Sequence, residues 1–339
     1  FDLLASTEGE VRVRVPSMPF ALNESTVALI ELPVEDMLLR NLAQAWRVIS
    51  AAQEASRPLV ELIKERAPGN QVGFIFGPPG TGKTTALADR LIATARNTEA
   101  KVLVLTPTNT AADVLYKRIS EKASDDFKVL QAVHRFTSQN KDIFLGDGYP
   151  AVVISTMHRF SFDKFANGMH LDQVAWDHVV FDETSMAALP YALLPIFSLP
   201  DNRGASDWGV LGARFLFAGD PFQLMPVGAT PSMKDKIDAS QKGQKIRGYS
   251  TENIFSLAGI NSFHLDEAPE LPGARIDRLA TNYRSGRSIV DLFSSTFYES
   301  GVSSERGSDV HDITLGGAPL PPIGLWSFPV LLSQKDGAA

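Results

Sequence analysis

One short segment constrains the fold of this chain more than any other. Residues 77–84 read Gly-Pro-Pro-Gly-Thr-Gly-Lys-Thr and fit the phosphate-binding pattern Gly-x-x-x-x-Gly-Lys-Ser/Thr. The apolar run Val72–Phe76 before it has the length of a strand, and residues 84–94 after it have the Ala- and Leu-rich composition of a helix. Strand, glycine-rich loop and helix therefore follow in the order of a P-loop, which favours that reading over an ordinary Gly/Pro turn.

The residues of this loop suit a nucleotide with its magnesium ion. The glycines let successive backbone N–H groups converge on phosphate oxygens, and the following helix begins with its positive dipole end near the same anion. We expect Lys83 to reach the β- and γ-phosphates and the Thr84 hydroxyl to ligate Mg²⁺. The predicted nucleotide-binding set is Gly77, Pro78, Pro79, Gly80, Thr81, Gly82, Lys83, Thr84 and Thr85.

Two further apolar strands end in residues suited to nucleotide hydrolysis. The run His178–Phe181 leads into Asp182 and Glu183, which is the Walker-B arrangement. Asp182 is suited to hold Mg²⁺ through its water shell, and Glu183 to orient and deprotonate the attacking water. An isolated Asp-Glu pair can instead cap a helix, but this pair follows both a P-loop and an apolar strand. In residues 219–226 we expect Gln223 to touch the γ-phosphate or the attacking water.

The order of these segments, with two more, is similar to that of a known family. The segments are GPPGTGKT, then TPTNTAA at residues 106–112, DETS at 182–185, GDPFQLMP at 219–226 and TNYRS at 281–285. This series resembles the superfamily 1 helicases, in particular the branch that contains the nonsense-decay RNA helicase and its relatives. The resemblance covers residues 71–300 and leaves both ends of the chain outside it.

The resemblance implies an α/β fold and a domain organisation. A RecA-like P-loop NTPase domain, a parallel sheet covered by helices, would occupy residues 71–273. An N-terminal extension or accessory subdomain would precede it at residues 1–70, with an exposed strand at 10–15, and residues 274–339 would begin a second RecA-like domain. The strand-length apolar runs themselves predict such a sheet, because they alternate with helical connections; they lie at residues 72–76, 101–105, 152–155, 178–181 and 214–218.

The resemblance also implies further residues around the nucleotide. Tyr283 would stack near the adenine, and Arg284 would reach the γ-phosphate from the second domain, which suits an aromatic face and a guanidinium. Members of the family read the adenine edge with an upstream glutamine. Gln53 is the candidate here and Gln44 the second choice, with a surface glutamine as the alternative. The expected catalytic set is Lys83, Asp182, Glu183, Gln223 and Arg284.

Contacts to nucleic acid are implied at two other strand ends. Thr106, Thr108 and Asn109 would meet the strand, and Thr156 is a further candidate at the end of the run at 152–155. Backbone contacts of this kind carry little base or sugar information, so both single-stranded DNA and single-stranded RNA remain candidate partners.

These motifs together predict an ATP hydrolase that couples hydrolysis of Mg-ATP to movement along a single strand, from 5′ to 3′ as in the relatives. The alternative is a nucleotide-gated binding or assembly module derived from a helicase, in which ATP only switches partners. We find no counterpart of the family's motifs V and VI, with their second arginine, after Ser300, and this keeps the alternative open. A stand-alone P-loop NTPase is a third hypothesis, which the segments at 106–112 and 281–285 disfavour.

Composition adds limits to these hypotheses. The chain has 339 residues, of which 44% are hydrophobic and 21% charged, as is typical of a soluble globular protein. It has no cysteine, which excludes disulfides and thiolate metal sites. No apolar stretch is long enough to span a membrane and no signal segment is evident, so we expect a cytoplasmic or nuclear setting.

Charge placement matters more than net charge for nucleic-acid binding. A net charge of −7 argues against a uniformly basic surface but leaves room for a local groove. Lys117, Arg118 and Lys122 form one basic cluster that could track phosphates, and residues 234–247 form another. A solvated loop is the alternative for the second cluster.

Overall fold

The computed structural model describes residues 2–7, 10–14, 59–67, 72–97, 100–137, 151–163, 171–187, 189–200, 209–223, 253–307, 314–315 and 318–319. The chain divides into two compact units, residues 1–36 and 37–339. The first unit contains an antiparallel pair of strands, β1 (Asp2–Thr7) and β2 (Glu10–Arg14). The strand predicted near residues 10–15 is therefore confirmed.

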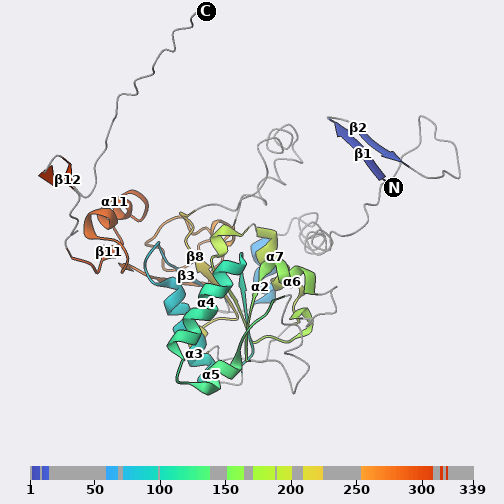
Figure 1. The fold of residues 1–339 in the computed structure, drawn as a ribbon, viewed down its shortest axis with the longest axis horizontal. Helices are drawn as coiled ribbons and strands as arrows, with labels where there is room; N and C mark the ends of the chain where they lie inside the picture. Colours follow the sequence, from blue (N-terminus) through green and yellow to red (C-terminus); the bar gives the residue numbers. More distant parts are fainter. Residues whose placement is uncertain are drawn as a thin grey trace, which may run out of the picture. The chain divides into compact units, whose positions relative to one another are not determined.

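The second unit is built on a seven-stranded parallel sheet (Figure 1), whose strands lie in the order β5-β6-β4-β7-β8-β3-β9. The strands are β3 (Val72–Phe76), β4 (Val102–Thr106), β5 (Val133–Arg135), β6 (Val152–Thr156), β7 (His178–Phe181), β8 (Phe215–Gly219) and β9 (Arg275–Arg278). Every residue of β3, β4, β6, β7 and β8 is buried, as expected for parallel strands that helices cover on both faces. The predicted RecA-like α/β fold is confirmed.

Helices cover the two faces of the sheet in separate groups (Figure 1). One face carries α3 (Lys83–Asn97), α4 (Asn109–Lys122) and α5 (Phe127–Ala132). The other face carries α2 (Leu59–Arg66), α6 (Met157–Asp163), α7 (Leu189–Ser198) and α10 (Ile254–Leu257). Short 3-10 turns lie at η2 (Leu171–Gln173), η3 (Thr184–Met186) and η4 (Gly209–Leu211).

A smaller C-terminal part follows β9. It contains α11 (Arg287–Phe297) and the parallel pair β10 (Thr281–Asn282) and β11 (Ser303–Ser304). The antiparallel pair β12 (Thr314–Leu315) and β13 (Ala318–Pro319) comes last. Among the described residues, no helix combines the length and the apolar composition needed to cross a lipid bilayer.

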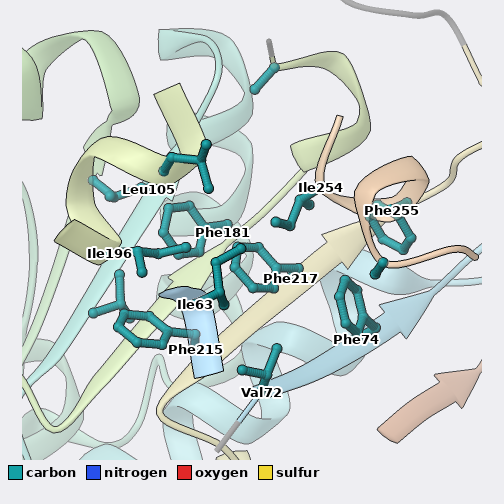
Figure 2. Close-up of a cluster of buried hydrophobic side chains, with 14 of the residues drawn as sticks. Ile63, Val72, Phe74, Leu105, Phe181, Ile196, Phe215, Phe217, Ile254 and Phe255 are labelled. Atoms are coloured by element: carbon teal, nitrogen blue, oxygen red, sulfur yellow. The ribbon is translucent and has the colours of Figure 1, made fainter. Parts of the chain in front are cut away.

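The core forms because alternate residues of each strand point to opposite faces. Phe74 and Phe76 of β3 belong to the cluster under α2 and α7, whereas Ile75 belongs to the cluster under α3 and α4. Figure 2 shows the aromatic side of the sheet, where Phe181 and Phe217 stack with their ring centroids 4.7 Å apart. Full burial of one such side chain contributes about 1.5–3 kcal/mol, so the packing of this face stabilises the sheet.

Two elements extend the sheet domain beyond the predicted limits of residues 71 and 273. Strand β9 pairs with β3 in parallel, so the sheet continues to residue 278. Helix α2 buries Leu59, Leu62 and Ile63, whose helical spacing presents one apolar face, in the core under the sheet. Apolar packing and backbone pairing therefore attach both elements to this domain.

Candidate active site

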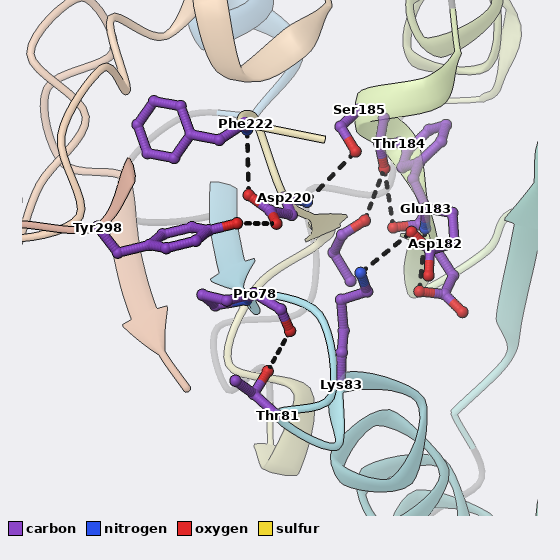
Figure 3. A network of polar contacts seen from close by, with 12 residues as sticks. Pro78, Thr81, Lys83, Asp182, Glu183, Thr184, Ser185, Asp220, Phe222 and Tyr298 are labelled. Carbon is purple, nitrogen blue, oxygen red and sulfur yellow. Dashed lines mark hydrogen bonds and ion pairs between the residues drawn. The ribbon is translucent and has the colours of Figure 1, made fainter. Parts of the chain in front are cut away.

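The carboxyl ends of three strands meet at one edge of the sheet, with β8 between β3 and β7. The P-loop follows β3, Asp182 follows β7 and Asp220 follows β8, so all three lie together, as Figure 3 shows. The backbone N–H of Gly77 donates to the carbonyl oxygen of Gly219 at 3.0 Å, which ties the start of the loop to the neighbouring strand. This is the edge at which open parallel sheets bind ligands.

The P-loop has the backbone conformation that its glycines allow. Gly80 and Gly82 have φ angles of 78° and 80°, in the left-handed region that favours glycine. A Cβ atom on Gly80 would lie 2.6 Å from Nδ2 of Asn282, so no side chain fits there. The Thr81 hydroxyl donates to the carbonyl oxygen of Pro78 at 2.7 Å, and helix α3 begins at Lys83. The free N–H groups of the first turn of α3 can therefore serve an anion held by the loop.

Lys83 is aimed at the Walker-B carboxylates. Its side chain is buried, and its Nζ lies 3.0 Å from Oε2 of Glu183. Glu183 itself has a left-handed backbone, with φ 51° and ψ 35°, which is uncommon for a residue with a side chain. Such strained backbone is typical of functional sites, because the surrounding structure must hold it in place.

Asp182 has the environment of a cation ligand. Its side chain is buried, and its Oδ1 accepts a hydrogen bond from the backbone N–H of Glu183 at 3.0 Å. Burial and the neighbouring Glu183 raise the pKa of Asp182 to about 6, although Lys83 acts in the opposite direction. A carboxylate whose charge is this poorly compensated suits a divalent cation, and the residues present therefore fit Mg²⁺.

A buried hydrogen-bond network fixes the turn after β8 (Figure 3). The Tyr298 hydroxyl donates to Oδ2 of Asp220 at 2.7 Å, and the N–H of Phe222 donates to Oδ1 at 3.0 Å. Burial raises the pKa of Asp220, while the bonds from Tyr298 and Phe222 lower it. The N–H of Gln223 donates to the Asp220 carbonyl oxygen at 3.1 Å, so the turn that carries Gln223 is held through Asp220. Sequence reasoning missed Tyr298, because no local pattern links residue 298 to residue 220.

The segment after β9 lies against the P-loop. Asn282 is buried; its Nδ2 donates to the Pro79 carbonyl oxygen, and its Oδ1 accepts from the N–H of Arg284 at 2.9 Å. The N–H of Tyr283 donates to the Gly80 carbonyl oxygen at 2.9 Å, and the residue as a whole is 58% exposed. Asn282, which sequence reasoning did not assign, thus attaches the Tyr283-Arg284 pair to the phosphate loop.

Most of the predicted nucleotide residues line one cavity of about 550 Å³. From the predicted set it is lined by Pro78, Pro79, Gly80, Gly82, Lys83, Thr84, Thr85, Glu183, Gln223, Tyr283 and Arg284. Val114, Arg118 and Arg306 also line it, and sequence reasoning did not place them there. Gly77, Thr81 and Asp182 adjoin it in the loop and at the end of β7, and Gln53 and Gln44 lie outside the described residues.

The residues predicted to meet nucleic acid lie at the ends of β4 and β6, on the same edge of the sheet. Thr106 and Thr156 are buried; Thr106 donates to the Thr108 carbonyl oxygen at 2.8 Å, and Thr156 accepts from the N–H of Arg159 at 3.0 Å. Thr108 and Asn109 are exposed.

Asn109 is held by an arginine from β5. Oδ1 of Asn109 accepts from Nη2 of Arg135 at 2.8 Å, which leaves the amide NH₂ group as the free end. The Nε of the same arginine donates to Asp113 at 2.8 Å, so its guanidinium is fixed by two partners on α4. The basic stretch at 234–247 lies outside the described residues.

Comparisons with known proteins agree with these motifs. A family model described as an AAA domain matches residues 61–229. The chain is 25% identical to the human (Homo sapiens) RNA helicase Mov10l1 over 78% of this chain and 21% of that protein. It is 24% identical to the regulator of nonsense transcripts 1 homolog of Neurospora crassa over 69% of this chain and 22% of that protein. The chain thus spans about a fifth of the length of these relatives.

Among solved structures, Bacteroides sp Pif1 in complex with ADP-AlF4 is similar, with 15% identity over 72% of this chain and 46% of that chain and a TM-score of 0.34. The residues that the family model matches include the motifs between residues 77 and 226. The chain belongs to the superfamily 1 helicases, in the branch that contains the nonsense-decay RNA helicase and its relatives.

Proposed function

We propose that this chain hydrolyses ATP and uses the energy to move along a single strand of nucleic acid, from 5′ to 3′. The observation that carries this proposal is the convergence of Lys83, Glu183, Gln223, Tyr283 and Arg284 on one cavity. These residues come from four separate segments of the chain, and each is of a type that phosphoryl transfer requires. The exposed Asn109 stands at the end of β4, on the same edge of the sheet.

In the proposed cycle the chain's own groups act in sequence. Lys83 leaves its ion pair with Glu183 and binds the β- and γ-phosphates, because a polyphosphate carries more negative charge than one carboxylate. Glu183, once released, accepts the proton of the attacking water, which Gln223 orients. Arg284 stabilises the charge that develops on the γ-phosphate. Magnesium, held by Thr84 and Asp182, would neutralise phosphate charge as a Lewis acid.

The ion pair between Lys83 and Glu183 determines the order of nucleotide binding and water activation in this proposed cycle. While the pair is intact, the carboxylate of the general base is held by the amine of Lys83. Nucleotide binding competes for Lys83 and frees the base only when a phosphate is in place. Water is therefore activated after, and not before, the substrate has bound.

Strand binding is proposed at the amino end of α4. The Asn109 amide offers its NH₂ donors, and Thr108 is exposed beside it, so both suit backbone phosphates. Thr106 and Thr156 are buried, so their side chains act by shaping this end of the helices. RNA is the first polymer to test, since relatives such as Mov10l1 are named as RNA helicases, with DNA beside it.

ATP hydrolysis with and without a strand tests the proposal. Turnover of the wild type and of Lys83→Ala is measured alone, with single-stranded RNA and with single-stranded DNA. We expect a strand-stimulated rate in the wild type and a loss of about 10²-fold in Lys83→Ala, because the mobile charge aimed at the phosphates is gone. Equal turnover in both proteins would refute the assignment of the site.

The same experiment separates the motor from its rival. Hydrolysis that neither polymer stimulates would favour a nucleotide-gated binding module over a motor. If one polymer stimulates turnover, duplexes with a 5′ or a 3′ single-stranded tail then test direction. Strand displacement confined to the 5′-tailed duplex is expected, and displacement confined to the 3′-tailed duplex would overturn the direction.

A further inference from the structure

A second cavity, of about 490 Å³, lies at the amino ends of β3, β8 and β9, away from the phosphate loop. Gly73, which lines it, stands four positions before Gly77 on β3, a distance of about 13 Å along an extended strand. None of the residues that line this cavity lines the nucleotide cavity. Its volume falls within the range of small-molecule sites, about 300–1,000 Å³.

The floor of this cavity is backbone, because the sheet has a glycine there. Gly73 pairs in register with Leu216 of β8 on one side and with Arg275 of β9 on the other. The three residues therefore point to the same face of the sheet, which is the face that α3 covers. A Cβ atom on Gly73 would lie 3.2 Å from Cδ1 of Leu216, so a side chain at this position would crowd the core. Glycine thus keeps the floor open beside Arg275.

The 3-10 turn η4 provides an apolar part of the lining. Gly209 and Gly212 have φ angles of 50° and 68°, in the left-handed region that favours glycine, and the N–H of Gly212 donates to the Gly209 carbonyl oxygen at 3.2 Å. A Cβ atom on either glycine would meet no described atom within 4 Å, so both face open space. Between them Val210 is 48% exposed and lines the cavity. This valine offers its apolar surface to a ligand instead of to the core.

Two arginines and one aspartate give the rest of the lining its charge. Nη2 of Arg90 on α3 donates to Oδ2 of Asp277 on β9 at 2.5 Å, which fixes one guanidinium between the helix and the edge strand. Arg275 precedes Asp277 by two residues on the same face of β9. Its side chain is exposed and has no hydrogen bond or ion pair with any described residue. Because two guanidinium groups face one carboxylate, the lining carries one uncompensated positive charge.

We propose that this cavity is a binding site for a small organic monocarboxylate, whose carboxylate pairs with Arg275 and whose apolar body packs against Val210. A guanidinium binds a carboxylate through two parallel hydrogen bonds, and Arg275 has both donors free. The single excess charge of the lining matches a monoanion. A phosphate monoester carries close to two negative charges at neutral pH, so Asp277 would repel it more strongly.

Three probes that share a phenyl ring test the charge that the site accepts. The probes are 4-phenylbutyrate, its neutral amide 4-phenylbutyramide, and phenyl phosphate, and their affinities are measured by NMR titration of the wild type. We expect 4-phenylbutyrate to bind about tenfold more tightly than the amide, in the range of a charge-assisted hydrogen bond. Phenyl phosphate should bind more weakly than 4-phenylbutyrate. Saturating ATP should displace none of the three, because the two cavities share no residue.

Substitutions on one strand assign the binding to the cavity. Arg275→Ala should weaken 4-phenylbutyrate about tenfold and leave the amide unchanged, which also shows that the cavity is intact. Arg278→Ala is the control, since Arg278 lies on the same strand, pairs with Asp266 and does not line the cavity. It should bind all probes like the wild type. Val210→Asp adds a negative charge to the lining and should weaken the acid more than the amide.

Several results would overturn the assignment. Equal affinity for the acid and the amide would show that the cavity does not recognise an anion, and tighter binding of phenyl phosphate would refute the preference for a monocarboxylate. Equal weakening in Arg275→Ala and Arg278→Ala would assign the effect to overall charge. Displacement of 4-phenylbutyrate by ATP would place the probe in the nucleotide cavity, and the absence of binding at millimolar concentration would refute the site.

Discussion

At the ends of β3, β7 and β8 charged side chains face a cavity, whereas at the ends of β4, β5 and β6 polar side chains are bonded within the protein. Among the residues that the structure describes, Lys83 of the first region pairs only with the catalytic candidate Glu183, and the side chains of Arg284 and Arg306 have no partner. In the second region Thr106 and Thr156 are buried and hydrogen-bonded.

The difference between the two regions indicates what each is prepared to bind. The unpaired cations around the glycine loop suit a compact, highly charged anion. Binding of that anion supplies the opposite charge that these side chains lack in the free protein. The hydroxyls of the second region already serve as local structural bonds; the Thr108 side chain caps α4 by accepting from Ala111 N at 3.1 Å, a bond typically worth about 1 kcal/mol. The unpaired cationic side chains thus identify the nucleotide site. In the strand region most polar groups are already bonded within the protein, so few hydrogen-bond donors are left to contact a strand.

The largest expected effect isolates the nucleotide region. Glu183→Gln keeps the size of the side chain but removes the base, so turnover should fall about 10²-fold or more. ATP affinity should hold or increase, because Lys83 loses its anionic partner in the free protein. Strand binding should be unchanged.

Turnover, ATP affinity and strand affinity are measured on the same preparation of Glu183→Gln. Glu121→Gln is the control, since Glu121 is an exposed glutamate whose partner Lys117 lies outside the cavity lining. Wild-type turnover in Glu183→Gln would show that another group activates the water. An equal loss of strand binding would contradict the separation of the two regions.

The second prediction changes only the strand region. Asn109→Asp retains the acceptor that Arg135 holds at 2.8 Å but replaces the free NH₂ donors by a negatively charged oxygen. Loss of a donor to phosphate and the added repulsion should weaken single-strand binding about tenfold, while strand-free ATP hydrolysis stays unchanged.

Fluorescence anisotropy with labelled single-stranded RNA and DNA measures this effect. Ser124→Asp adds the same charge just beyond the opposite end of α4 and should have little influence on strand affinity. Equal weakening in both variants would mean that net charge and not the Asn109 donors is responsible. No weakening in Asn109→Asp would remove this residue from the strand site.

The sequence predicts those parts of the fold and of the site that adjacent residues encode, and it predicts less well those that depend on residues far apart in the chain. The strands β3 and β7 match their apolar runs, and the P-loop lies where its glycine pattern requires, because these signals are encoded in adjacent residues. Strand β9 was not predicted: its burial pattern is mainly exposed, as at a sheet edge, so it carries no continuous apolar run.

The missed site residues share a physical reason. Arg118, Arg306 and Tyr298 act only through tertiary placement, and nothing in their neighbouring residues distinguishes them from a solvated arginine or a core tyrosine. The sequence shows which chemical group a residue carries, whereas the fold determines which ligand or side chain that group contacts.

The smallest expected effect concerns a buried polar pair of the nucleotide region, Tyr298 and Asp220, that is hydrogen-bonded within the protein. Tyr298→Phe removes the hydroxyl that donates to Asp220 at 2.7 Å and leaves a buried carboxylate oxygen without that donor. The turn bearing Gln223 should loosen, so turnover should fall about threefold to tenfold at saturating ATP with ATP affinity unchanged, and stability should fall by about 1–3 kcal/mol. Loss of the bond also raises the pKa of Asp220 further, because the Tyr298 hydroxyl lowers it in the wild type.

The pH dependence of this stability loss distinguishes the mechanism. Burial already raises the pKa of Asp220 in the folded state, so folding favours its protonated form and the destabilising effect of its charge disappears as the pH falls toward that pKa. A protonated carboxyl needs the Tyr298 donor less, and the difference in unfolding free energy between wild type and Tyr298→Phe should therefore shrink on acidification. Tyr116→Phe removes a hydroxyl that makes no bond among the described residues and should change neither quantity. If Tyr298→Phe loses stability equally at all pH values and keeps full turnover, its hydroxyl serves packing alone, and the Gln223 turn is positioned by the strand end itself.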